Sequence, residues 1–402
     1  METKALVKIE DVKEFEKLFK VSIPVVEEID YYINTLKKSM EYIFIDDKLA
    51  AFAELEAFAK DNGYKGAKDY KMSYALPKMK KYILGTIAYD KLQNFDYSKE
   101  NFRTKDQVKN NEGHFLLSID FSAANFNAIK SFDEKFPSEF NGSWEELCEH
   151  LDIHPTLGKS KSFRQIVFGN TNPKRLQKVQ HLKIMELINI FLEDKEFITE
   201  EDDIVFISHD EFIIRIPGSE LTGGNFVEGV VYKLKQLSKH INMPIHTTTF
   251  KLDKIGKDMF LKTVYHPSFS YINTSVPGGG SGPKFLSEGH KTLFGVPGNK
   301  FYKYFKTHVL GEDVEERDLY FVSYGEMAIW KEDEDSIDST FIPDGEMTLE
   351  EVEKDYPYYL KKLKDEVPGL NDAQRRKIIN LFMSTCNHCH ETELPCHCWN
   401  DD

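Results

Sequence analysis

The chain has 402 residues, of which 41% are hydrophobic and 13% aromatic. This composition supports two or three domains with buried cores and excludes a disordered chain. No apolar run reaches the roughly 20 residues that span a membrane, and the charged N-terminus does not resemble a signal peptide. We therefore expect no membrane segment and an intracellular protein of a reducing compartment, cytoplasmic or nuclear.

The formal net charge of −15 argues against a nucleic-acid partner only if the charge is spread evenly. It is not, because residues 312–355 hold 17 acidic and three basic residues. Residues 155–185, in contrast, hold seven basic residues and no acidic one. Such a stretch is either an anion-binding site or a solvated helix face.

The expected elements alternate between helices and short apolar strands. An apolar periodicity of three and four residues indicates helices, and β-branched or alternating runs indicate strands. A polar, strandless linker is expected at 97–113, and a capping box at Ser143 predicts a helix start. The remaining elements are helices at 25–42, 48–60, 174–193, 226–241, 348–365 and 372–384, and strands at 114–121, 204–208, 212–216, 245–254 and 318–323.

This order predicts an α+β fold with an antiparallel-sheet core, a helical N-terminal region and a small zinc-binding C-terminus. We expect a helical region at 1–110, a sheet domain at 111–258, an accessory α+β segment of unknown role at 259–347 and a helical C-terminus at 348–402.

Three acidic residues lie at predicted strand ends. Asp120 ends one buried strand, and Asp210 and Glu211 lie in the turn between two others. If these strands are neighbours, the carboxylates converge and favour Mg²⁺, which prefers oxygen ligands and substrate phosphates. Two such ions can activate a hydroxyl and stabilise a leaving phosphate. A helix N-terminus and a β-turn would explain the same residues without any metal.

Four short motifs in this region resemble the polymerase core of the DNA polymerase I family (family A). They are Asp120-Phe121-Ser122-Ala123-Ala124-Asn125-Phe126, Asp152-Ile153-His154, Arg164-Gln165-Ile166-Val167-Phe168-Gly169 and His209-Asp210-Glu211. They resemble the first palm motif, the DIH before the fingers helix, the K-x-x-x-F-G fingers motif and the VHDE palm motif. The resemblance covers roughly residues 114–255.

The resemblance implies a palm in which Asp120 and Asp210 hold two catalytic Mg²⁺ ions, with Glu211 as an accessory acid. Arg164 stands where the family has the fingers lysine that contacts the incoming triphosphate, and Lys159 and Lys161 would add positive charge there. His154 and Asn125 would complete the substrate site. The expected partners are a nucleic-acid primer and template and nucleoside triphosphates.

The sequence also departs from the family. The glutamate that helps to exclude ribose is replaced by Asn125, and the fingers tyrosine that partners it falls near Asn172. The fingers are short, and no exonuclease domain fits before residue 114. These departures predict a minimal relative that tolerates ribonucleotides.

Four of the five cysteines lie within the last 17 residues. Cys386, Cys389, Cys396 and Cys398 supply four thiolates, and His388, His390 and His397 are alternative ligands. Four filled positions are typical of a structural Zn²⁺ site, so we expect a zinc knuckle.

The function expected from the sequence is template-directed nucleotidyl transfer from a nucleoside triphosphate to a 3′-hydroxyl, with two Mg²⁺ ions as catalytic and Zn²⁺ as structural cofactor. The alternatives are an RNA polymerase or primase-like enzyme, and a non-catalytic nucleic-acid-binding replication scaffold. An ion pair between the acids and a Lys or Arg would favour the scaffold.

Overall fold

The computed structural model forms two compact units, residues 1–313 and 314–402. The ranges that it describes are 9–96, 103–133, 142–198, 200–218, 220–269, 284–323 and 326–329. The larger unit combines helices with a seven-stranded antiparallel sheet, which confirms the predicted α+β class. The predicted domain limits at 110, 258 and 347 stay predictions.

The N-terminal part of the larger unit is helical, as predicted. The helix predicted at 25–42 is shorter than expected, because Ser39 leaves the helical conformation and its hydroxyl accepts a hydrogen bond from the Glu41 amide. A π-helical turn at 71–75 separates two of the helices. The α-helices are α1 (Ile9–Phe19), α2 (Ile29–Lys37), α3 (Ile45–Asp61), α4 (Ala67–Tyr70), α5 (Leu76–Leu84) and α6 (Ile87–Asn94).

Four short helices follow the first long strand and share one hydrophobic core with the N-terminal helices. Trp144 and Phe163 are buried in this core together with Phe15 and Phe52. The predicted capping box is confirmed, since Ser143 and Glu146 exchange their hydrogen bonds. The helices are α7 (Ala124–Lys130), α8 (Trp144–His150), α9 (Pro155–Lys159) and α10 (Lys161–Gly169).

The sheet has the strand order β1-β3-β4-β2-β5-β6-β7, and each adjacent pair is antiparallel. The predicted hairpin β3–β4 and the strands β2 and β5 are confirmed, whereas the linker at 97–113 contains the two-residue strand β1 that we did not predict. The strands are β1 (Lys105–Asp106), β2 (Phe115–Phe121), β3 (Ile204–Ile207), β4 (Glu211–Arg215), β5 (Ile245–Gly256), β6 (Met259–Phe269) and β7 (Lys284–Phe294).

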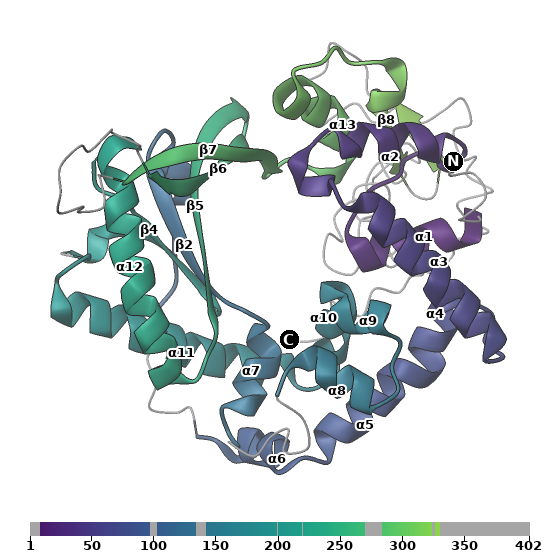
Figure 1. Ribbon diagram of the computed structural model, residues 1–402, viewed down its shortest axis with the longest axis horizontal. Coiled ribbons are helices and arrows are strands. Elements are labelled where there is room, and N and C mark those ends of the chain that lie inside the picture. Colours follow the sequence, from purple (N-terminus) through teal and green to yellow (C-terminus); the bar gives the residue numbers. More distant parts are fainter. Residues whose placement is uncertain are drawn as a thin grey trace, which may run out of the picture. The chain divides into compact units, whose positions relative to one another are not determined.

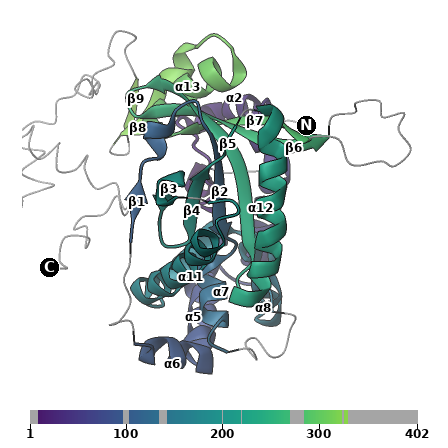
Figure 2. The ribbon, with the colours of Figure 1, turned by 90° about the vertical axis from the view of Figure 1, so that its left-hand side faces the viewer.

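One face of the sheet is covered by two long helices, α11 (Pro173–Asp194) and α12 (Glu220–Ile241). Figure 2 shows α12 running alongside β5. Alternate residues of β2, such as Leu117 and Ile119, pack under these helices with Phe212 and Ile214 of β4. Because side chains alternate across a strand, Ser118 and Asp120 lie on the opposite face.

The opposite face is apolar at one end and polar at the other. Leu116, Ile213 and Phe250 belong to a small hydrophobic cluster at the apolar end. The register places Asp120 of β2 beside Glu211 of β4 and His246 of β5, at the polar end of this face. Figure 1 shows β2, β4 and β5 side by side with the helices α11 and α12.

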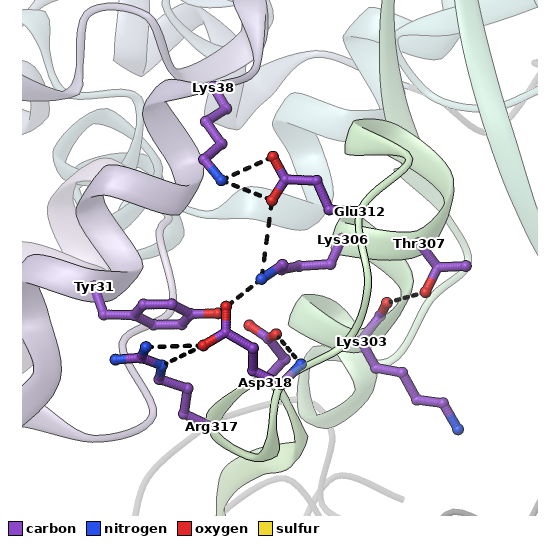
Figure 3. A network of polar contacts seen from close by, with 9 residues as sticks. Tyr31, Lys38, Lys303, Lys306, Thr307, Glu312, Arg317 and Asp318 are labelled. Carbon is purple, nitrogen blue, oxygen red and sulfur yellow. Dashed lines mark hydrogen bonds and ion pairs between the residues drawn. The ribbon is translucent and has the colours of Figure 1, made fainter.

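The segment after β7 is tied to the N-terminal helices. It contains α13 (Phe301–Tyr304) and a π-helical turn over 305–310. The Glu312 carboxylate pairs with Lys38 at 2.6 Å and lies 3.9 Å from the buried Lys306 ammonium, which donates to the Tyr31 hydroxyl at 3.1 Å (Figure 3). Glu312 thus joins cations from distant parts of the sequence within the larger unit.

The smaller unit is described only for residues 314–323 and 326–329. It contains the antiparallel pair β8 (Tyr320–Ser323) and β9 (Glu326–Ile329), of which the first agrees with the predicted strand. Arg317 pairs with Glu315 at 2.8 Å. The helices predicted at 348–365 and 372–384 and the cysteine cluster lie outside the described residues.

No helix in the described ranges is both long and apolar enough to cross a membrane.

Candidate active site

The three predicted acids come together at one end of the sheet. Asp120 and Glu211 are direct cross-strand partners on β2 and β4. Asp210 precedes Glu211 in the tight β3–β4 turn, where the Ser208 amide donates to the Glu211 carbonyl at 2.8 Å. The Asp210 carbonyl accepts a hydrogen bond from the Phe121 amide at 2.9 Å, which holds the turn against the end of β2. All three acidic side chains are partly exposed.

The chain turns sharply after Asp120 and Phe121. The Ser122 amide donates to the Pro244 carbonyl at 2.9 Å, and the Ser122 carbonyl accepts from the Asn127 side chain at 2.7 Å. Ala123 then takes a left-handed conformation with φ of 47° and begins α7. Asp120 is the one acidic residue of β2 and lies near its end, on the face of the sheet opposite α11 and α12, which we call the open face.

Ala123→Gly is expected to stabilise the protein by about 1 kcal/mol, because a side chain with a Cβ atom is strained in the left-handed region and glycine is not. Urea unfolding of the variant and wild type measures the difference. Ala128→Gly is the matched control, since Ala128 lies within the helical range of α7, where glycine is expected to destabilise. A loss of stability in Ala123→Gly would contradict this account of the turn.

The site carries more negative charge than its surroundings balance. Burial raises the pKa of Asp120 to about 7, with the nearby charges of Asp210 and Glu211 adding to the rise and Lys161 opposing it. The Ser118 hydroxyl donates to Glu211 at 2.5 Å. Within the described residues no Lys or Arg forms an ion pair with any of the three acids. The repulsion between the carboxylates is therefore not relieved by an ion pair among the described residues.

A further lysine on the open face was not predicted. Lys262 of β6 lies 4.2 Å from the Phe250 ring centroid, and burial lowers its pKa while the charges of Glu211 and Glu41 oppose that change. The sequence offers one signal, because Lys262 alternates with the apolar Phe260 and Val264 on the same strand face. Lys262 therefore adds positive charge on the Glu211 side of the site.

The three predicted residues of the basic stretch lie in different surroundings. Lys161, the first residue of α10, is exposed and its charge reaches Asp120. Arg164 lies one turn later, where burial lowers its pKa and the charge of Glu145 opposes that change. Lys159 is exposed on α9. Of these three cations, Lys161 is the one whose charge acts on Asp120 among the described residues.

His154 contacts the N-terminal helices. Its ring lies 4.9 Å from that of Phe58, its Nδ1 accepts from the Thr156 amide, and its own amide donates to the Tyr70 hydroxyl. These contacts fix the start of α9. Asn125 lies on α7 and its side-chain oxygen accepts from the buried Gln180 of α11 at 2.7 Å. The structure thus joins the predicted sugar-contacting residue to α11.

The chemistry of the acids fits a divalent cation. Burial first, and then the neighbouring carboxylates, raise the pKa of Asp120, and Mg²⁺ would relieve the repulsion between the carboxylates. In the described part of the chain no three or more His, Cys, Asp or Glu residues form a ready metal cage. Mg²⁺ is commonly held by one or two carboxylates, with water and substrate phosphates completing its shell. The cysteines expected to bind Zn²⁺ lie outside the described residues.

A scan of the chain against protein-family models and a search of curated proteins find no match.

Proposed function

We propose that the chain is a nucleotidyltransferase that joins the α-phosphate of a nucleoside triphosphate to a 3′-hydroxyl, directed by a template. The observation that carries the proposal is the convergence of Asp120, Asp210 and Glu211 at one end of the open sheet face without a Lys or Arg partner within the described residues. Acids without an ion-pair partner can bind the cation of a metal–nucleotide complex, and the exposed Lys161 can bind its phosphates.

In the reaction the hydroxyl oxygen bonds to the α-phosphorus and pyrophosphate leaves. Bound Mg²⁺ would supply activation of the hydroxyl and neutralisation of the leaving phosphate. Asp120 and Asp210 would hold it, because their backbones are fixed by the β2–β4 pairing and by the Phe121–Asp210 hydrogen bond. Glu211 is oriented by Ser118, and Lys161 neutralises phosphate charge.

The absence of an ion pair to the acids within the described residues favours an enzyme over a scaffold. Asn125 supports ribonucleotide use as a part of the proposal. Its amide is shorter than glutamate, carries no charge and can hydrogen-bond a 2′-hydroxyl. The Gln180 contact occupies its oxygen and leaves the amide group as the donor.

Primer extension tests the proposal. We expect Mg²⁺-dependent incorporation of the nucleotide complementary to the template base, with ATP used within ~100-fold of dATP, because a site that tolerates a hydroxyl discriminates weakly. Single-nucleotide incorporation is measured with dATP and ATP, with and without template. Template-independent addition would contradict template direction. A dATP preference above roughly a thousandfold would contradict the ribonucleotide use ascribed to Asn125 and leave the rest of the proposal standing.

The nucleic-acid and nucleotide partners, the zinc knuckle and an intracellular, reducing location belong to the same proposal. They are supported by the basic stretch at 155–185 and by the clustered cysteines.

A further inference from the structure

A small cavity opens beside the C-terminal end of α1. It has a volume of about 220 Å³ and is lined by Lys20, Val21, Leu36, Tyr42 and Phe301, among others. Pockets for drug-sized ligands usually occupy ~300–1,000 Å³, so this cavity suits a single ring system. Its lining combines aromatic and aliphatic side chains with one cation.

Lys20 holds an unusual backbone conformation at the rim of this cavity. It follows the last residue of α1 with φ of 53°, in the left-handed region. Glycine or asparagine commonly fills such a position after a helix, because a longer side chain is strained there. Strained backbone positions of this kind cluster at functional sites. The exposed side chain of Lys20 lines the cavity.

Contacts on two sides link the lining of the cavity to residues whose charges act on the acids. On one side, the Ser160 hydroxyl donates to the Leu18 carbonyl at 3.2 Å, which joins the start of α10 to the end of α1. This contact brings Lys161 near Lys20, and the charge of Lys161 lowers the pKa of Lys20 after the larger effect of burial. Lys161 in turn reaches Asp120.

On the other side, the charges of Glu211 and Glu41 both act on Lys262, and Glu41 directly precedes the cavity residue Tyr42. The two neighbouring lysines, Lys20 and Lys161, repel each other unless an anion lies between them. An aromatic cavity with two adjacent cations is the combination that binds single-stranded nucleic acid.

We propose that the cavity receives one unpaired base of a single-stranded nucleic acid and that Lys20 binds its backbone phosphate, while Lys161 serves the phosphates of the nucleotide. The proposal rests on the proposed function, because it assigns the occupant to the strand that the acidic site copies. A free nucleotide is the alternative occupant, and ATP binding by Tyr42→Ala distinguishes it from a single strand.

The phosphate contact is tested by the salt dependence of binding. Fluorescence anisotropy measures the affinity of the full chain for a labelled 12-nucleotide single strand, DNA or RNA, at several salt concentrations. Lys20→Met keeps the aliphatic stem and should reduce the slope of log K against log salt by about 0.7, the value for one phosphate contact on a single strand. Lys13→Met, an exposed position on α1, is the control and should leave the slope unchanged.

The base contact is tested with Tyr42→Ala. The loss of a stacked base should weaken binding about tenfold or more, whereas Tyr42→Phe keeps the ring and should bind like wild type. A 12-mer made only of abasic sites should bind wild type and Tyr42→Ala equally, which separates stacking from a general loss of folding.

An unchanged salt slope in Lys20→Met would overturn the proposal. An equal loss for normal and abasic strands would do the same, as would Tyr42→Ala weakening ATP binding but not oligonucleotide binding. Asp210→Asn should retain oligonucleotide binding. A failure of this inference is therefore distinguishable from a failure of nucleotidyl transfer, which concerns the acids.

Discussion

Asp210→Asn is expected to lower the rate of nucleotide incorporation by about a thousandfold or more. Losing a carboxylate ligand for a catalytic divalent cation removes several kcal/mol of transition-state stabilisation, and each 1.36 kcal/mol corresponds to about a factor of ten in rate. The asparagine side chain has the same shape but no negative charge. Single-turnover incorporation with saturating primer–template and nucleotide measures the rate.

The same substitution should leave the melting temperature of the metal-free protein unchanged or slightly raised, because it removes a negative charge that repels Asp120. Asp202→Asn is the matched control. Asp202 is highly exposed, at the base of the same hairpin, and its weak contact with Lys105 is 3.7 Å long. An Asp210→Asn variant with near wild-type activity would show that the palm-like assignment is wrong.

The second large effect is a loss of stability of the metal-free protein as the pH rises. An aspartate in an unfolded chain has a pKa near 3.9, whereas that of Asp120 in the folded protein is about 7. Between these values the folded state binds a proton that the unfolded state does not. The contribution of Asp120 is therefore fully present below about pH 4 and is lost as the pH rises through 7.

Because Asp120 is partly exposed, solvent screening reduces the effect to on the order of 1–2 kcal/mol. Asp120→Asn removes the titration, so its free energy of unfolding should exceed that of wild type at pH 8 and approach it at pH 5. Urea unfolding at both pH values, with divalent cations removed, measures the two differences. Mg²⁺ at pH 8 should stabilise wild type only. A difference between variant and wild type that does not change with pH contradicts the raised pKa.

The elements predicted correctly are those with strong local signals. The hairpin around His209 follows from two apolar runs joined by a polar turn, and the start of α8 follows from the capping box at Ser143. Strand β6 was missed because Pro267 and the exposed His266 interrupt its apolar pattern. Proline removes a ladder donor and argues against a strand. At Pro267 strand β6 pairs with β7 alone, because its pairing with β5 ends at Tyr265.

The acids of the candidate site were predictable because strand ends with acidic residues are local features of the sequence. Their cationic neighbours were predictable only in part. The fingers motif pointed to Arg164, with Lys159 and Lys161 beside it, and Lys161 is the one whose charge acts on Asp120. Lys262 comes near Glu211 through strand pairing, and Lys20 comes near Lys161 through packing, in both cases between segments far apart in the sequence.

The zinc knuckle stays a prediction, since Cys386 and its neighbours lie outside the described residues. Its ligands are close together in the sequence, so the proposal depends on spacing alone.

Nucleotidyl transfer by this chain requires the carboxylates to form a cation site, and counting bound Mn²⁺ by electron paramagnetic resonance tests this most directly. Mn²⁺ prefers oxygen ligands, as Mg²⁺ does. With a nucleoside triphosphate present, wild type and Asp202→Asn should bind more Mn²⁺ per chain than the folded double variant Asp120→Asn/Asp210→Asn, by at least one ion. Equal Mn²⁺ binding by wild type and the double variant, at matched melting temperatures, would contradict the account.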